Sequence, residues 1–362
     1  MGFIEERKIF MNNHITLKKV KERLTEAKLE FKALDLGGGF CIICTARGGR
    51  ILGPFENEDG ESLTWLNPAF ESKERFAEFL NDDDWNLGGD RMWCLPEMPF
   101  FVKKRNDFFD TYVVQKELDP GNYALDSDGK CVSMGQSVRL STFETGGVVK
   151  EFTLGREIRN AANPLDNSDK AAELMQGVKY CGILQTVKMN VLDSDETLYL
   201  EPWLLTQINP SGNLIVPTVS KAEYIDYYEP VPQDYIDIKE KSTRLKVTGD
   251  LRYKVGFKAS QLTGRSGYIG MLSDGRAYLF FRNYFNNPSA VYCGDPYAKP
   301  GLYGCSLYLY NGHTAQGGFS EFEHCSSTVS GDTGMNESSE LSGYYFYIGK
   351  KSAVEKIAEE LI

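Results

Sequence analysis

The chain has 362 residues, of which 41% are hydrophobic and 25% are charged, values typical of a folded globular protein. Its formal net charge of -11 provides no basic footprint for nucleic acid, and no apolar run approaches the roughly 20 residues that a membrane-spanning helix needs. We therefore expect no nucleic-acid partner, no membrane contact and a cytoplasmic location.

The chain begins with a helical pattern. Thr16 is a suitable N-cap, and Leu17, Val20, Leu24 and Ala27 share one stripe, which predicts an amphipathic helix. After about residue 30 the pattern changes, so we divide the chain into an N-terminal helical extension, 1–30, and a single domain, 31–362.

Short apolar or alternating runs between Gly, Asn, Asp and Pro then predict strands. The strand candidates are Phe40–Thr45, Arg50–Pro54, Phe109–Val114, Ser137–Phe143, Gly182–Leu192, Leu198–Gln207, Tyr253–Ala259, Ala277–Arg282, Ser306–Tyr310 and Gly343–Ile348. Further short helices are expected at Ser72–Asn81, Ala162–Gln176 and the C-terminal Ser352–Leu361. This pattern predicts an all-β sandwich with helical additions.

Two segments have residue spacings that resemble those of metal sites. Cys41 and Cys44 have zinc-like spacing, but on a strand their sulfurs face opposite sides, which favours core thiols. Asp126–Gly129 resembles the start of a calcium loop, but its glycine comes too early, which favours a hairpin turn. We expect no metal site and no cofactor.

The stretch Trp85–Glu97 carries indole rings and charged groups around the pair Gly88 and Gly89. Indole faces stack on the C–H groups of a sugar while guanidinium and carboxylate groups bond its hydroxyls, so Arg91, Trp93 and Glu97 are candidate carbohydrate contacts. The alternative is structural, with tryptophans filling the core and Arg91 and Glu97 forming a buried ion pair.

A second charged stretch, Phe319–His324, alternates as a strand does. Glu321 and Glu323 should share one face, with Phe322 and His324 on the other. The glutamates either line a cleft or lie on a solvated face, and His324 is expected to be a packing residue. Arg47 and Arg50 either bind an anionic group of a modified sugar or decorate a surface loop.

These residues resemble a family when taken in order. The runs Ala46–Pro54, Leu63–Asn67, Gly88–Glu97, Glu201–Gln207, Tyr253–Gly256 and Phe319–His324 are similar to a bacterial branch of the galactose mutarotase-like (aldose 1-epimerase-like) superfamily. The resemblance spans roughly residues 30–345 and implies an antiparallel β supersandwich whose concave face binds sugars.

In aldose 1-epimerases, a glutamate takes the proton of the anomeric hydroxyl and a histidine protonates the ring oxygen. Glu321 best matches that glutamate and Glu323 is the alternative, while Trp203–Gln207 resembles the strand that supplies the acid histidine. This strand has Trp203 and Gln207 but no histidine, and Gly88–Arg91 replaces the second sugar-binding histidine.

Two functions follow from the resemblance. In the first, the protein binds a mono- or oligosaccharide or a sugar derivative through Arg91, Trp93, Glu97, Trp203, Gln207, Arg47 and Arg50 together with the glutamates. In the second, it interconverts anomers, with Glu321 or Glu323 as base and His313 or water as acid. The missing histidines favour binding. The sequence does not indicate the oligomeric state.

Overall fold

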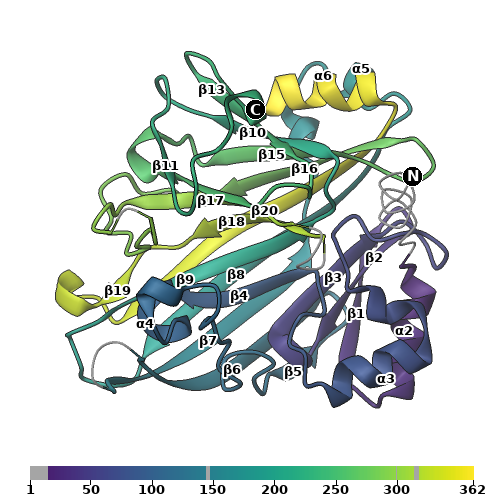
Figure 1. Cartoon of the computed structure of the whole chain (residues 1–362). Helices are drawn as coiled ribbons and strands as arrows, with labels where there is room; N and C mark the ends of the chain where they lie inside the picture. The colour runs from purple at the N-terminus through teal and green to yellow at the C-terminus, as the bar shows by residue number, and fades with distance from the viewer. Residues whose placement is uncertain (1–14, 144–146, 299, 314–317) are drawn as a thin grey trace, which may run out of the picture.

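A computed structural model describes residues 15–143, 147–298, 300–313 and 318–362 of the chain. Two large sheets pack face to face, and helices lie at their outer surfaces (Figure 1). Each strand pairing within the described residues is antiparallel. The predicted all-β sandwich with an N-terminal and a C-terminal helix is therefore confirmed.

Sheet 1 carries the segments singled out above. Its strands, in spatial order, are β1 (Phe31–Gly37), β2 (Phe40–Thr45), β3 (Arg50–Phe55), β4 (Asp90–Leu95), β9 (Tyr199–Ile208), β18 (Ser320–Cys325), β17 (Cys305–Asn311), β14 (Tyr253–Lys258) and β11 (Tyr224–Asp226), with β19 (Val329–Ser330) paired to β9. The strands β4, β9 and β18, distant in sequence, are therefore neighbours at its centre.

Sheet 2 forms the opposite layer. In spatial order it contains β12 (Ile236–Ile238), β13 (Ser242–Val247), β10 (Gly212–Pro217), β15 (Arg265–Met271), β16 (Ala277–Tyr284), β20 (Glu337–Gly349), β8 (Lys179–Val191), β7 (Val149–Asn160), β6 (Cys131–Ser141) and β5 (Ala124–Ser127). Asp126 and Ser127 end β5, and Asp128 and Gly129 lie in the turn to its partner β6, so the hairpin prediction is confirmed.

The main core lies between the sheets because alternate residues of each strand point inward. Phe322 of sheet 1 meets Phe280 of sheet 2 with ring centroids 5.4 Å apart, and Phe280 stacks on Phe346 at 4.6 Å. Cys44 belongs to this core, whereas Cys41 packs on the other side of sheet 1, as the strand interpretation of this pair requires.

Helices cover parts of the outer faces of the sandwich (Figure 1). Helix α2 (Leu17–Glu26) is capped by Thr16 and buries Leu17, Val20 and Leu24, as predicted. It packs with α3 (Lys73–Asn81) against the outer side of β2 and β3, while α6 (Lys351–Leu361) and α5 (Ala171–Leu174) lie on sheet 2. Helix α4 (Glu97–Phe101) lies over the outer face of sheet 1.

Two predicted elements are wrong. Phe109–Val114 forms no strand, because Thr111 bonds back to Asp107 in a turn and only Tyr112 makes an isolated bridge. Ala162–Gln176 is not one helix, because Pro164 begins a separate 3-10 turn and only Ala171–Leu174 is α-helical. No helix among the described residues is long and apolar enough to span a membrane.

Candidate functional site

The outer face of sheet 1 brings together residues from four strands. Strand alternation turns Glu321 and Glu323 outward, while Phe322 and His324 point into the sandwich. Gln207 is paired directly with Glu321, Glu321 with Tyr310, and Tyr310 with Lys254. We call Gln207, Glu321, Tyr310 and Lys254 the outer polar row; directly opposed residues have Cβ atoms about 5 Å apart.

Arg91 joins this row from β4. Its Nη1 lies 2.7 Å from Glu321 Oε1, and the Nε2 of Gln207 donates to the same oxygen at 3.1 Å. The guanidinium of Arg91 lies 4.1 Å from the centroid of the Trp93 ring and 5.1 Å from that of Trp85. A carboxylate, an amide and a guanidinium thus converge beside two indole rings.

Several polar atoms of this group have no hydrogen bond. The Nε and Nη1 of Arg91, the Oε1 of Gln207 and the Oε1 of Glu323 are buried and make none, although Arg91 Nη1 is close enough to Glu321 for an ion pair. Unsatisfied buried polar atoms are costly, so their concentration here indicates a place where water or a ligand supplies the missing bonds.

Lys254, the last member of the row, is also the centre of a second ionic group. The Nζ of Lys254 is 3.3 Å from Glu323 Oε2 and 3.8 Å from Glu97 Oε2, and the Nε1 of Trp203 donates to Glu323 at 2.8 Å. Burial alone would lower the pKa of Lys254, but Glu323, Glu97 and Glu321 together raise it. One ammonium group is therefore shared by several carboxylates.

Glu323 has the opposite balance. Burial raises the pKa of its carboxyl group to about 7; Lys254 opposes this shift, whereas Glu321 and Glu97 add to it. The pKa values of Lys254 and Glu323 are both raised, although the two groups are ion-pair partners. The two shifts are compatible, because several carboxylates share the single ammonium group of Lys254. Glu323 can therefore change protonation state near neutral pH.

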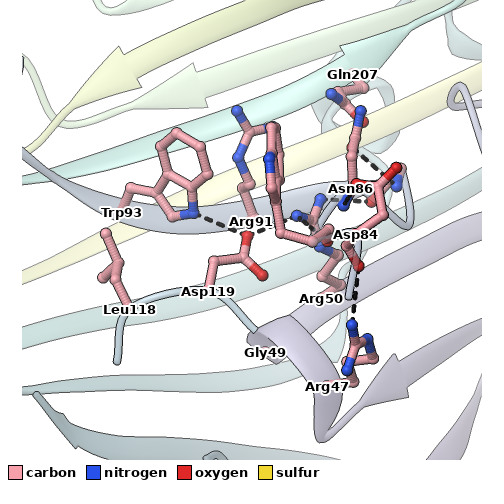
Figure 2. Close-up of polar contacts among 12 residues, drawn as sticks. Arg47, Gly49, Arg50, Asp84, Asn86, Arg91, Trp93, Leu118, Asp119 and Gln207 are labelled. Atoms are coloured by element: carbon pink, nitrogen blue, oxygen red, sulfur yellow. Dashed lines mark hydrogen bonds and ion pairs between the residues drawn. The ribbon is translucent and has the colours of Figure 1, made fainter. Parts of the chain in front are cut away.

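Arg50 and Trp93 meet at Asp119 (Figure 2). Asp119 accepts a hydrogen bond from Arg50 at 2.6 Å and from the Nε1 of Trp93 at 3.0 Å. Arg50 also donates to the carbonyl oxygens of Gly88 and Trp85. Burial raises the pKa of Asp119 and lowers that of Arg50 to about 10, while each partner's charge opposes the shift. This buried pair fixes the Gly88 turn against β3.

Aromatic side chains surround the exposed edge of Glu321. Tyr310 faces it from β17, and Tyr310 contacts Phe319 with centroids 6.2 Å apart. Tyr112 packs on Phe101 with ring centroids 5.6 Å apart, and burial, followed by the charges of Glu97 and Glu321, raises the pKa of its phenol. Tyr228 lies 6.3 Å from Tyr310.

The remaining predicted residues are not members of the outer polar row. Arg47 donates to the carbonyl oxygen of Asp84 (Figure 2). Its guanidinium also lies over the Phe79 ring. His313 is exposed, two residues beyond the end of β17. His324 is buried on the inner face, where Nδ1 lies 2.9 Å from Arg282, as expected of a packing residue. His14 lies outside the described residues.

Sequence reasoning missed Lys254, Tyr310, Tyr112 and Asp119. Lys254 stands between apolar residues of one strand and Tyr310 is the penultimate residue of another, so alternation alone could have marked both as outward-facing. Their strand partners are set by the register of sheet 1, which the sequence does not show. Tyr112 and Asp119 lie in a loop, where no regular alternation of the sequence marks them as site residues.

A small recess lies at this face, and two larger hollows lie elsewhere on the molecule. A recess lined by Glu97, Lys254 and Trp203 has a free volume of about 10 Å³, which is close to that of one water molecule. Two larger hollows, of about 390 and 430 Å³, lie elsewhere: one between loops at Glu56 and Arg276, the other on the outer face of sheet 2. No metal-ligating group of three or more acidic, cysteine or histidine side chains is found among the described residues.

The protein is a two-sheet antiparallel sandwich, and a cluster of charged and aromatic side chains lies at the centre of sheet 1. The chain belongs to a family of unknown function, DUF6786, whose family model matches residues 28–362. No curated protein matches the chain.

Solved structures give distant similarities. A candidate aldose 1-epimerase from Klebsiella pneumoniae subsp. pneumoniae MGH 78578 has 11% identity and a TM-score of 0.46, over 96% of this chain and 94% of that chain. A galactose 1-epimerase from Lactobacillus acidophilus NCFM has 11% identity and a TM-score of 0.45, over 89% and 95%. An aldose epimerase homologue from C. elegans has 10% identity and a TM-score of 0.45, over 88% and 98%. The fold assignment itself rests on the two sheets.

Proposed function

We propose that the protein binds a carbohydrate, a mono- or oligosaccharide or a sugar derivative, at the outer polar row. The observation that carries this proposal is the convergence of Arg91, Gln207 and Tyr310 on Glu321, whose side chain is 9% exposed. Sugar hydroxyls both donate and accept, so they suit a surface that presents carboxylate, amide, phenol and guanidinium groups together.

The unsatisfied atoms support this assignment. Arg91 Nε needs an acceptor and Gln207 Oε1 needs a donor, and a hydroxyl group supplies either. The recess beside Glu97 is too small for a sugar ring, so the ligand lies above Glu321 and Tyr310. There Tyr112, Tyr228 and Phe319 provide apolar surface for its C–H groups.

The predicted residues then divide by role. Glu321, Arg91, Gln207 and Glu97 contact the ligand. The rings of Trp93 and Trp203 already contact the cations of Arg91 and Lys254, and their N–H groups are donated to Asp119 and Glu323, so we assign them to holding the site rather than stacking on the sugar. Arg50 holds the Gly88 turn, and Arg47 stabilises the loop at Asp84.

A second candidate function is the interconversion of sugar anomers. It is favoured by Glu323, because a carboxyl group with a pKa of about 7 can exchange protons near neutral pH next to Glu321. In this version Glu321 is the base, Glu323 is the alternative, and the acid is His313 or a water molecule. No cofactor takes part.

A sugar panel followed by saturation-transfer NMR tests both functions. We expect transfer from the wild-type protein to at least one sugar and its loss in Glu321→Gln, which keeps the size of the side chain but removes its charge. Glu157→Gln is the matched control, because Glu157 pairs with Lys188 on an exposed surface of sheet 2. Thermal melting of each variant confirms that it is folded.

Exchange spectroscopy on the same samples separates binding from catalysis. Anomer exchange that wild type accelerates and Glu321→Gln does not would establish the second candidate. Saturation transfer without accelerated exchange supports binding alone. Transfer that Glu321→Gln leaves unchanged, or no transfer from any sugar in the panel, refutes the assignment of this site.

A further inference from the structure

A charged network lies between the two sheets, on the side of sheet 1 opposite the candidate site. Arg156 of β7 bonds to Asp90 of β4 and to the side-chain oxygen of Gln185. Thr206 donates to Asp90 at 2.5 Å and accepts from Arg282 of β16. The network therefore bridges both sheets through buried side chains.

The charges of this network do not balance. Arg156 and Arg282 each carry a positive charge at 0–2% exposure, and Asp90 is the one acidic side chain bonded to the network within the described residues. Arg282 otherwise bonds to neutral acceptors, the carbonyl oxygen of Phe322 and the Nδ1 of His324. Burial, and then Arg282 and Arg156, lower the pKa of His324, so this ring adds no positive charge and offers no negative one.

Five polar residues of sheet 2 lie around Arg282 and face the same space as its side chain. Together with Arg282 they form two adjacent rows of directly paired residues, the first on β15, β16 and β20 and the second on β16, β20 and β8. We call these six the inner polar patch: Ser266, Arg282 and Tyr344 in the first row, and Tyr284, Ser342 and Gln185 in the second.

Each member of the inner polar patch has a buried polar atom without a hydrogen bond. These atoms are Ser266 Oγ, Arg282 Nε, Tyr344 Oη, Tyr284 Oη, Ser342 Oγ and Gln185 Nε2. Ser266 is close enough to affect the pKa of Tyr284, and Gln185 that of Tyr344, but neither pair reaches hydrogen-bond geometry. All six atoms are able to donate a hydrogen bond.

We propose that a monovalent anion of halide size binds between the sheets, at the inner polar patch beside Arg282. An anion beside Arg282 Nε accepts hydrogen bonds from this guanidinium and from neighbouring donors of the patch, and it neutralises the excess guanidinium charge. Ordered water would satisfy the hydroxyls but would leave a buried positive charge without a counter-ion, which is the more costly arrangement. A sugar carboxylate cannot be this anion, because the patch lies inside the sandwich and its residues are only 0–5% exposed.

Bromide is the direct probe. Crystals of the full chain soaked in sodium bromide and measured at the bromine absorption edge should show an anomalous peak within hydrogen-bonding distance of Arg282 Nε. The absence of such a peak, or water density there without anomalous signal, overturns the proposal. This measurement uses the wild-type protein and needs no folded variant.

Thermal unfolding gives a second test. At constant ionic strength, replacing gluconate by chloride should raise the melting temperature, because chloride fits the patch and gluconate does not. Ser342→Ala should reduce this increase, whereas Arg139→Gln, at an exposed ion pair on β6, should retain it. Equal melting temperatures of the wild type in the two salts refute the proposal.

Discussion

Glu201 anchors a loop to the outer face of sheet 1, and its protonation should control stability. It lies on β9 two residues before Trp203 and is fully buried. Its Oε2 accepts from the backbone N–H of Cys293 and from Thr328 Oγ1, both at 2.6 Å, while its Oε1 has no partner. Burial raises the pKa of this carboxyl group from 4.5 to about 7, and the hydrogen bonds oppose that shift.

The direction of the effect follows from proton binding. Between pH 4.5 and about 7 the folded protein holds a proton on Glu201 that the unfolded chain has released, so stability falls as the pH rises. The difference between the two pKa values corresponds to about 3 kcal/mol, fully expressed above pH 7. Glu201→Gln removes this titration.

Urea unfolding of wild type and Glu201→Gln at about pH 4.5 and pH 8 measures the contribution of Glu201 to the pH dependence of stability. The stability of the variant relative to wild type should increase by about 3 kcal/mol across this range. Glu157→Gln is a control of opposite sign, because Lys188 lowers the pKa of the exposed Glu157. A pH-independent difference between wild type and Glu201→Gln would refute the buried-proton explanation.

Three further substitutions probe the supports of the candidate site. Arg50→Met leaves the carboxylate of Asp119 buried without its cation and should cost about 3 to 5 kcal/mol in urea unfolding, part of which Arg50→Met/Asp119→Asn should restore. Trp203→Phe removes the N–H donated to Glu323 and should cost about 2 kcal/mol by the same assay. Gly89→Ala places a Cβ 2.3 Å from a carbonyl oxygen of β3 at a positive φ, and thermal melting should show a loss of more than about 1 kcal/mol; an unchanged melting temperature would contradict the close approach.

The regular parts of the sheets could be predicted because their side chains alternate. The strand Ser320–Cys325 shows this well, since its period of two correctly separates Glu321 and Glu323 from Phe322 and His324. The helices α2 and α6 were likewise predictable from their apolar stripes. In each case a local pattern decides the local structure.

The neighbours of these strands could not be predicted from local patterns. Lys254 meets Glu323 only because β14, β17 and β18 are adjacent in sheet 1, although the two residues are far apart in the sequence. Asp119 reaches Trp93 from a loop, so no periodicity marks it as the partner of that indole. The interpretation in which indole rings stack on a sugar also gave no sign that the N–H groups of Trp93 and Trp203 are donated to Asp119 and Glu323.

The centre of sheet 1 is polar on both faces, and this bears on what the site can do. On β4, Asp90 points into the charged network between the sheets and Arg91 points to the candidate site; on β9, Thr206 and Gln207 divide in the same way. Moving either strand would break bonds on both faces at once. The groups that meet Glu321 are therefore held in fixed positions before any ligand arrives, which lowers the ordering cost of binding. A change on the inner face, such as the loss of the Thr206 hydroxyl in Thr206→Val, should accordingly weaken the sugar binding proposed at Glu321, measured as a smaller saturation transfer than in wild type.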